Sequence, residues 1–372
     1  MIFTNQVVRI LNVNFSILLM LCFSCMSLSC FLLDSKDLEN LPLKSSKGKI
    51  LFPEKIIIEQ SFNSKIQIKK IKIRYSISDS TVVNYGYPVI TYSDVVDTKY
   101  IINTSGNDFL PSGVVINYYY EITDMENNVT VTESNELEYL DDIYDWERII
   151  GDGLEILHHG LSQDKATILH RNILERINPI KKTFLKNSDL FEIKGVLFDS
   201  RKESSEAFQY LSDTTTKQHL FGGFAYSDYN LFLVSGYNVD VIVHEVTHLI
   251  LAEAMQSRKV LLPKWLNEGL AMYYQSNSND WKGESKNFVR RTQIMTLNKM
   301  NTLPGKAYDV GLFYRKSENI VGYLVYRYGI EKIALLIENL KNQGNFDSNF
   351  YKTYGITTQE LEKDWAESIL SK

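Results

Sequence analysis

The pattern of apolar and polar positions divides the chain into two parts with different periods. Between about residues 49 and 142, apolar and polar residues alternate in short segments rich in Ile, Val, Tyr and Thr. Alternation with a period of two is typical of β-strands that bury one face. The pattern predicts strands at residues 55–60, 65–78, 88–92, 113–122 and 128–133.

Strands of this length, separated by clusters of Asn, Ser, Gly and Asp, predict an antiparallel β-sandwich of the immunoglobulin-like kind over residues 49–146. The alternation slips at Lys69 and Lys70, so we expect a β-bulge there. Five basic residues lie between positions 65 and 74. We interpret them as a solvated outer face of the sheet, and a patch for anionic lipid or glycan is the alternative.

Beyond residue 143 the apolar residues recur at helical spacing instead. The spacing predicts helices at residues 163–177, 202–211, 239–255, 266–275, 317–328, 331–342 and 358–370, with strands at 192–198 and 225–235. We expect the first helix to stop before Pro179, because proline lacks a backbone donor. The mixture predicts an α+β domain over residues 150–372.

The N-terminus contains an uncharged apolar run. Residues 15–33 follow a stretch whose only basic side chain is Arg9, and they precede Asp34. This arrangement predicts a signal sequence or lipoprotein anchor over residues 1–33. The residues before Cys30 resemble a bacterial lipoprotein signal, which implies that Cys30 becomes the lipidated first residue of the mature chain. Lipidation at Cys25 is a second possibility, and an uncleaved helix is a third, because nineteen apolar residues can just cross a hydrocarbon core of ~30 Å.

Composition narrows the classes of function. The 40 basic and 45 acidic residues give a formal net charge of -5, whereas binding to a phosphate backbone needs a cationic excess, so nucleic acid is not an expected partner. All three cysteines lie at positions 22–30, so the rest of the chain contains no thiol for a disulfide, a nucleophile or a thiolate metal site.

We expect the part of the chain beyond the anchor segment to act outside the cytoplasm, in the bacterial cell envelope. The N-terminal anchor would hold it at the membrane, and secretion is the alternative.

Two histidines inside the predicted helix at 239–255 have the spacing of a metal site. His244 and His248 are four residues apart, so both imidazoles project from one helix face and can reach one Zn²⁺ at ~2.0–2.1 Å. Glu245 lies beside the first ligand, where it can take a proton from a metal-bound water. The flanking residues are apolar, which predicts burial, and buried imidazoles need partners such as a metal. Core histidines that bind backbone carbonyls are the alternative.

A resemblance to a known family extends this motif. HEVTH at 244–248 followed by WLNEGLA at 265–271 resembles the gluzincin zinc metallopeptidases, the clan of thermolysin and aminopeptidase N, and especially the bacterial peptidase MA-like domains. The resemblance implies a zincin-like domain at residues 150–372. It also implies that Glu268, nineteen residues beyond His248, is the third zinc ligand on a second helix. A carboxylate stabilised by the N-terminus of its own helix is the alternative.

The same resemblance implies further site residues. Tyr314, just before the predicted helix at 317–328, is the implied donor to the oxyanion, with Tyr308 as its nearest rival and a packing role as the alternative. Gly223, Phe224 and Ala225 are implied to form an edge strand that pairs with the substrate backbone, although a plain hairpin turn explains the two glycines, Gly222 and Gly223, equally well. The Gly-x-Met-x-Asn segment of the aminopeptidases is absent from this chain, which favours endopeptidase action.

These observations lead to the hypothesis of an exported zinc metallopeptidase that hydrolyses peptide bonds of peptide or protein substrates through a metal-bound water. One alternative is a catalytically weak or inactive zinc-domain protein whose sandwich binds an envelope component of unknown identity. Another is a zinc hydrolase that acts on esters or epoxides, because an activated water can attack those groups too.

Overall fold

The computed structural model describes residues 43–63, 67–93, 95–210, 222–256, 262–276, 281–342 and 345–371. The anchor segment predicted at residues 1–33, including Cys30, lies outside these residues. Among the described residues, no helix combines the length and the apolar composition that crossing a membrane requires.

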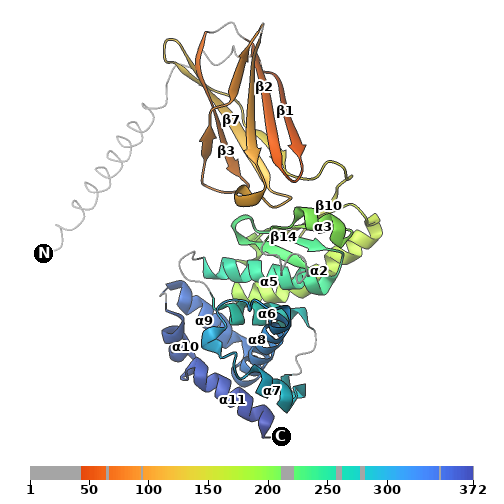
Figure 1. Ribbon diagram of the computed structural model, residues 1–372, viewed down its shortest axis with the longest axis vertical. Helices are drawn as coiled ribbons and strands as arrows, with labels where there is room; N and C mark the ends of the chain where they lie inside the picture. The colour runs from red at the N-terminus through yellow and green to blue at the C-terminus, as the bar shows by residue number, and fades with distance from the viewer. Residues whose placement is uncertain are drawn as a thin grey trace, which may run out of the picture.

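The described chain begins with two antiparallel sheets (Figure 1). One has the strand order β1-β2-β6-β5 and the other β4-β3-β7-β8, with β9 also paired to β7. Phe62 of β2 packs edge-on against Tyr120 of β7 between the sheets, with ring centroids 5.4 Å apart. The strands are β1 (Leu43–Leu51), β2 (Lys55–Asn63), β3 (Ile68–Ile77), β4 (Asn84–Gly86), β5 (Val89–Tyr92), β6 (Val95–Asn103), β7 (Val115–Asp124), β8 (Val129–Val131) and β9 (Asn135–Glu138). The predicted antiparallel sheets are therefore present, and their immunoglobulin-like type stays a prediction.

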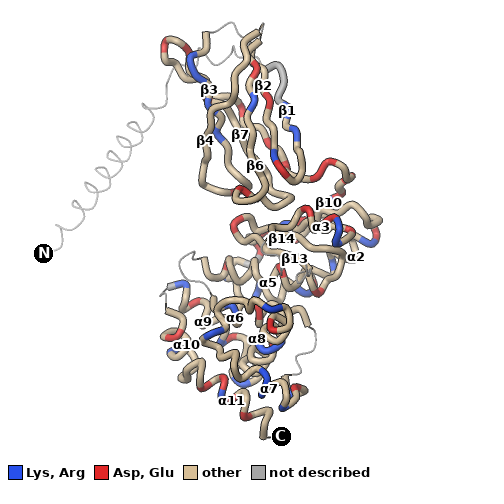
Figure 2. The backbone as a smooth tube through the Cα atoms, viewed as in Figure 1, with Lys and Arg blue, Asp and Glu red and all other residues tan. Residues whose placement is uncertain are grey.

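The register of β3 against β7 shifts between Ile68 and Lys70, which confirms the irregularity expected there. On the outer face of β3, Lys72 and Arg74 both form ion pairs with Glu121 of β7, at 2.8 and 2.7 Å. Along the whole described chain, Lys and Arg are interspersed with Asp and Glu (Figure 2). These pairings support the interpretation of the basic run as a solvated sheet face.

A third sheet follows, with the order β10-β11-β12-β14-β13. Its inner strands β11, β12 and β14 are parallel, and the edge strands β10 and β13 are antiparallel to their neighbours. The strands are β10 (Glu147–Gly151), β11 (Leu154–His158), β12 (Ile193–Phe198), β13 (Gly223–Tyr226) and β14 (Leu231–Ser235).

Both faces of this sheet are covered, which explains why its inner strands are almost continuously apolar. Phe232 and Val234 of β14 pack in one core with the helices α2 and α5, whereas Leu231 and Leu233 pack in the core of the sandwich. The sandwich and the mixed sheet are therefore joined through a shared apolar core.

The helices complete an α+β arrangement, with α6 to α11 beyond the face covered by α5 (Figure 1). The α-helices are α2 (Gln163–Phe184), α3 (Arg201–Ala207), α5 (Val239–Met255), α6 (Lys264–Gln275), α7 (Lys286–Thr292), α8 (Ala307–Tyr328), α9 (Ile330–Asn342), α10 (Phe346–Tyr354) and α11 (Thr358–Leu370). The short 3-10 helices are η1 (Gly106–Asp108), η2 (Ser188–Leu190), η3 (Ser227–Tyr229), η4 (Trp281–Gly283) and η5 (Leu297–Lys299).

Three sequence-based expectations were wrong. Helix α2 continues through Pro179 to Phe184, because its last turns are buried and Lys181 donates a hydrogen bond to the Phe191 carbonyl at 2.8 Å. The strand expected at 225–235 is a hairpin of β13 and β14, which turns at Asn230 in a left-handed conformation. Helix α8 begins at Ala307, ten residues earlier than expected, and its first turns already bury Val310 and Phe313 at helical spacing.

Helices α6 and α8 approach each other closely at Gly269. A Cβ atom there would lie 2.6 Å from the Ser317 carbonyl oxygen and 2.7 Å from Cγ2 of Val321. Real side chains do not tolerate such distances, so only glycine permits this packing. The contact fixes the residues of α6 next to Gly269 against α8.

We expect Gly269→Ala to lower the free energy of unfolding by about 1–3 kcal/mol, because the added methyl group must push the two helices apart. Gly311→Ala is the matched control on α8, where a Cβ would meet no atom within 4 Å. That change should stabilise the helix by about 0.5–1 kcal/mol through helix propensity. Urea unfolding followed by tryptophan fluorescence measures both, and equal effects of the two substitutions would contradict the close packing.

Candidate functional site

Helix α5 holds two imidazoles in a buried position. The helix packs between the mixed sheet and α6, and most of its side chains are buried. Its first turn is capped by Asn238, whose side-chain oxygen accepts a hydrogen bond from the Asp240 backbone amide at 2.8 Å. His244 and His248 lie one turn apart, with their Nε2 atoms separated by 3.2 Å.

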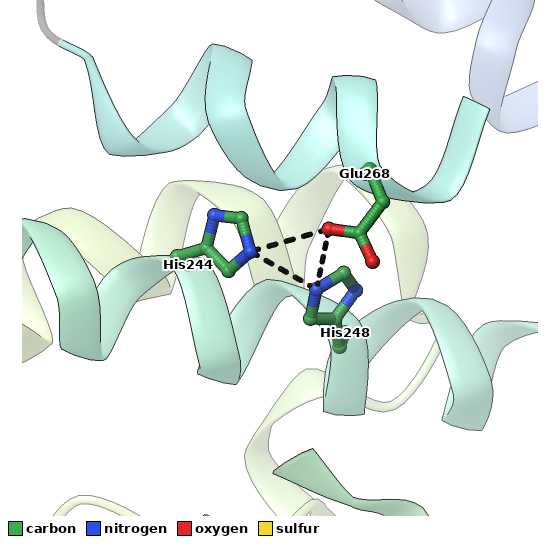
Figure 3. A group of neighbouring side chains, drawn as sticks. All are labelled: His244, His248 and Glu268. Atoms are coloured by element: carbon green, nitrogen blue, oxygen red, sulfur yellow. Dashed lines mark hydrogen bonds and ion pairs between the residues drawn. The ribbon is translucent and has the colours of Figure 1, made fainter. Parts of the chain in front are cut away.

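Glu268 reaches the same point from α6. Its Oε2 atom lies 3.4 Å from Nε2 of His244 and 3.4 Å from Nε2 of His248. Figure 3 shows the three side chains pointing toward one another from two neighbouring helices. Ligands placed tetrahedrally at 2.0–2.1 Å around a zinc ion lie about 3.3–3.4 Å apart. The triangle of ligand atoms therefore has the size that a tetrahedral metal site requires.

The hydrogen bonding of these atoms also fits a metal. Glu268 Oε2 and His244 Nδ1 are buried without a hydrogen-bond partner among the described residues. The Glu268 side chain is only 4% exposed. A buried carboxylate oxygen without a hydrogen bond is costly, and a bound cation removes that cost. Two imidazole nitrogens and one carboxylate oxygen are a donor set that suits a divalent metal such as zinc.

Two side chains outside the triangle hold the ligands in place. Asn267 presents Oδ1 to Nδ1 of His248 at 2.9 Å, which orients the ring with Nε2 toward the triangle. Lys264 places Nζ 2.7 Å from Oε1 of Glu268, the oxygen that faces away from the imidazoles. Neither residue was identified from the sequence, although both lie within four positions of Glu268.

The two buried glutamates have opposite electrostatic environments. Burial raises the pKa of Glu245 to about 7; the attraction of His244 opposes this shift and the Glu268 carboxylate adds to it. Burial also acts to raise the pKa of Glu268, but its attraction to His248, His244 and Lys264 is stronger and holds the pKa well below its usual value. Glu268 is therefore ionised, as a candidate metal ligand should be, whereas no basic side chain among the described residues forms an ion pair with Glu245.

Tyr314 also faces the site, but from inside α8 rather than from a segment before a helix, as the sequence had suggested. Its ring centroid lies 6.3 Å from that of His244. Burial raises the pKa of Tyr314 far above its usual value, and the Glu268 and Glu245 carboxylates raise it further. The phenol thus stays protonated. Tyr308, the rival, is 64% exposed at the start of α8.

A cavity of about 740 Å³ brings these groups together with the edge strand β13. Its lining includes the three ligands, Glu245 and Tyr314 as well as Gly223, Phe224 and Ala225. The Gly222 carbonyl accepts a hydrogen bond from the backbone amide of Ser235 in β14 at 2.9 Å. Hydrogen-bonded and non-hydrogen-bonded pairs alternate along an antiparallel ladder. The backbone N–H and C=O groups of Gly223 and Ala225 therefore point away from β14.

Gly223 is also the point at which β13 approaches the helix. A Cβ atom there would lie 2.8 Å from the Leu233 carbonyl oxygen and 2.9 Å from Cγ of Glu245. The absence of a side chain therefore lets the edge strand lie directly beside Glu245. Gly223, Phe224 and Ala225 therefore belong to an edge strand and not to a plain turn.

Residues 204–371 match the family model described as the Peptidase MA superfamily. The matched segment contains all three candidate ligands, Glu245 and Tyr314, and it supports a zincin-like peptidase domain. No curated protein matches the chain. Among solved structures, the crystal structure of a Br derivative of BhCBM56 matches at 9% identity over 25% of this chain and 88% of that chain, with a TM-score of 0.20, which carries no argument.

Three other histidines lie among the described residues, and His219 lies outside them. Nε2 of His170 lies 3.0 Å from the Leu154 carbonyl, and His159 stacks on Tyr144 with ring centroids 4.3 Å apart. His158 is buried at the end of β11. Among the described residues, His244, His248 and Glu268 form the one cluster of such donors close enough to share a metal ion.

We expect Glu268→Gln to weaken binding of Zn²⁺ by more than the ~10–100-fold typical of changes outside the ligand set, because the neutral amide is a poor ligand. The matched control is Glu253→Gln, which neutralises a carboxylate that lines the same cavity without joining the cluster. Competition with a chromogenic chelator measures the affinities. Equal affinity of the two variants would remove Glu268 from the ligand set.

Proposed function

We propose that this protein is a zinc-dependent metallopeptidase of the gluzincin type that cleaves internal bonds of peptide or protein substrates. The observation that carries the proposal is the triangle of buried ligand atoms, 3.2–3.4 Å apart, in a cavity that also contains a separate carboxylate and the free edge of a strand. The match of residues 204–371 to a peptidase superfamily supports the same reaction.

His244, His248 and Glu268 would hold the zinc ion. A zinc ion bound there supplies Lewis-acid activation of water and of the scissile carbonyl. Glu245 lines the cavity next to the first ligand and is not part of the triangle. Its carboxylate accepts the proton of the attacking water and delivers it to the nitrogen of the leaving amine, which is a general base and then a general acid role.

Tyr314 stabilises the negative charge that develops on the carbonyl oxygen. Its hydroxyl stays protonated at neutral pH because burial and two nearby carboxylates raise its pKa. A donor held in a fixed position is worth more than the same donor in solvent, since no reorganisation is needed as the charge forms.

The edge strand β13 binds the substrate. An extended peptide adds to a free sheet edge through its main chain, so binding does not depend on a free terminus. The backbone groups of Gly223 and Ala225 are oriented for this pairing, and Gly223 lies directly beside Glu245. Pairing here therefore favours cleavage within a chain over removal of terminal residues.

We propose in addition that residues 1–33 export the protein and that lipidation of Cys30 anchors it to the bacterial membrane. The sandwich, which shares a core with the mixed sheet, then lies between the anchor segment and the peptidase-like part along the chain. Substrates in this setting are peptides or proteins outside the cytoplasm.

Glu245→Gln should abolish hydrolysis while zinc is retained, because the amide is nearly isosteric but cannot take the proton. We expect a loss of about 10²–10⁴-fold in kcat from removing the proton transfer. Digestion of an unbiased peptide library, with and without a chelator, measures the activity, and metal analysis measures the zinc. Cleavage by the Gln variant at the wild-type rate would overturn the mechanism, whereas zinc binding without any cleavage by the wild type would favour a binding role.

For Tyr314→Phe we predict a fall in kcat of about 10²–10³-fold with little change in KM, since the hydroxyl acts on charge that forms only in the transition state. Tyr308→Phe is the control, as that hydroxyl lies on the exposed start of α8. Steady-state kinetics on a peptide found in the library distinguish the two. A loss shared equally by both variants would argue against the oxyanion role.

A further inference from the structure

Lys264 forms an ion pair with Glu268, one of the three candidate metal ligands. It is the first residue of α6, and its Nζ atom lies 2.7 Å from Oε1 of Glu268. The lysine side chain is 38% exposed and lines the cavity, whereas the glutamate side chain is 4% exposed. The two oxygens of one carboxylate thus have separate partners, because Oε2 faces His244 and His248.

Helix stability does not account for this lysine. A positive charge in the first turn opposes the helix macrodipole, which favours acidic residues there. A lysine four residues before a glutamate is also the less favourable order for an ion pair along a helix. Pro263 at the N-cap supplies no side-chain hydrogen bond that would compensate. The position of Lys264 is better explained by its effect on Glu268.

A carboxylate beside a metal can bind through one oxygen or through both. If both oxygens of Glu268 bound, the metal would gain a fourth protein ligand atom and become five-coordinate with its water, which leaves less room for substrate, since catalytic zinc sites combine three protein ligands with one open position. The contact with Lys264 occupies Oε1 and leaves Oε2 alone directed at the triangle.

We propose that Lys264 is a positioning residue that restricts Glu268 to coordination through a single oxygen and thereby keeps one metal position open. The proposal rests on the metal site of the proposed function. Lys264 is the one Lys or Arg among the described residues that line the cavity. Asn267, the nearest amide on α6, is already bonded to His248. Tyr314 also hydrogen-bonds to Glu268, but through a neutral hydroxyl. Loss of Lys264 therefore removes the one cation that the described cavity lining offers to Oε1, which can then turn toward the metal.

The test compares the Co²⁺-substituted wild-type chain with Lys264→Met by visible absorption, because the intensity of cobalt bands reports coordination number. We expect strong four-coordinate bands for the wild type and weaker five-coordinate bands for Lys264→Met, with cobalt still bound. The kcat of the zinc form should fall about 10–100-fold with little change in KM. Lys264→Arg should restore both the spectrum and kcat, since arginine also donates to a carboxylate.

Lys286→Met is the control, because Lys286 is likewise the first residue of a helix, α7, and is exposed outside the cavity. It should leave the spectrum unchanged. An unchanged cobalt spectrum in Lys264→Met would overturn the positioning role even if activity fell. A changed spectrum in a chain that cleaves no peptide would support this role and reject the peptidase instead. Failure of the wild type to bind cobalt would reject both.

Discussion

Two imidazole nitrogens and a carboxylate oxygen are held within 3.4 Å of one another in the interior of the C-terminal part, and the proposed function depends on this arrangement. Polar groups so close together and so poorly hydrogen-bonded are unfavourable in a protein core unless a cation joins them. The surrounding packing is therefore what forces the cluster to exist. Helix α5 is fixed by its apolar contacts with the mixed sheet, and α6 is fixed against α8 at Gly269.

The same packing brings the other functional groups to the cluster. Gly223 allows β13 to lie beside Glu245, so a substrate added to this sheet edge would extend past the carboxylate. Tyr314 approaches from α8, the helix that Gly269 holds against α6. Glu245, the sheet edge at Gly223 and Tyr314 thus come from three different elements, α5, β13 and α8. Rigid elements with this packing keep a site preorganised.

A residue of this site is predictable from the sequence when its contacts lie within one helix, and not when they depend on the packing of two helices. His244 and His248 were predictable because helix geometry alone fixes the distance between positions four apart. Glu268 lies on another helix, whose distance from α5 depends on tertiary packing, so only family resemblance indicated it. Lys264 and Asn267 were missed because their roles depend on where their side chains point after α6 has docked.

The fold shows the same division. The predicted strands of the sandwich are present, but β1, β4, β6 and β9 were not anticipated. In β6 the buried face includes Thr98, whose hydroxyl donates to the Gln60 carbonyl at 3.0 Å, so a polar residue interrupts the apolar alternation. Helix α2 passes through Pro179 because burial of its last turns outweighs the lost backbone hydrogen bond. In both β6 and α2, contacts with distant parts of the chain determine the secondary structure, which the local pattern of apolar residues does not predict.

Anomalous diffraction at the zinc absorption edge, from crystals of the zinc-loaded protein, would locate the bound metal. We expect one strong peak at about 2.0–2.1 Å from Nε2 of His244, Nε2 of His248 and Oε2 of Glu268, with no fourth protein atom within bonding distance. A peak at another site, or a fourth protein ligand that closes the remaining position, would contradict this expectation.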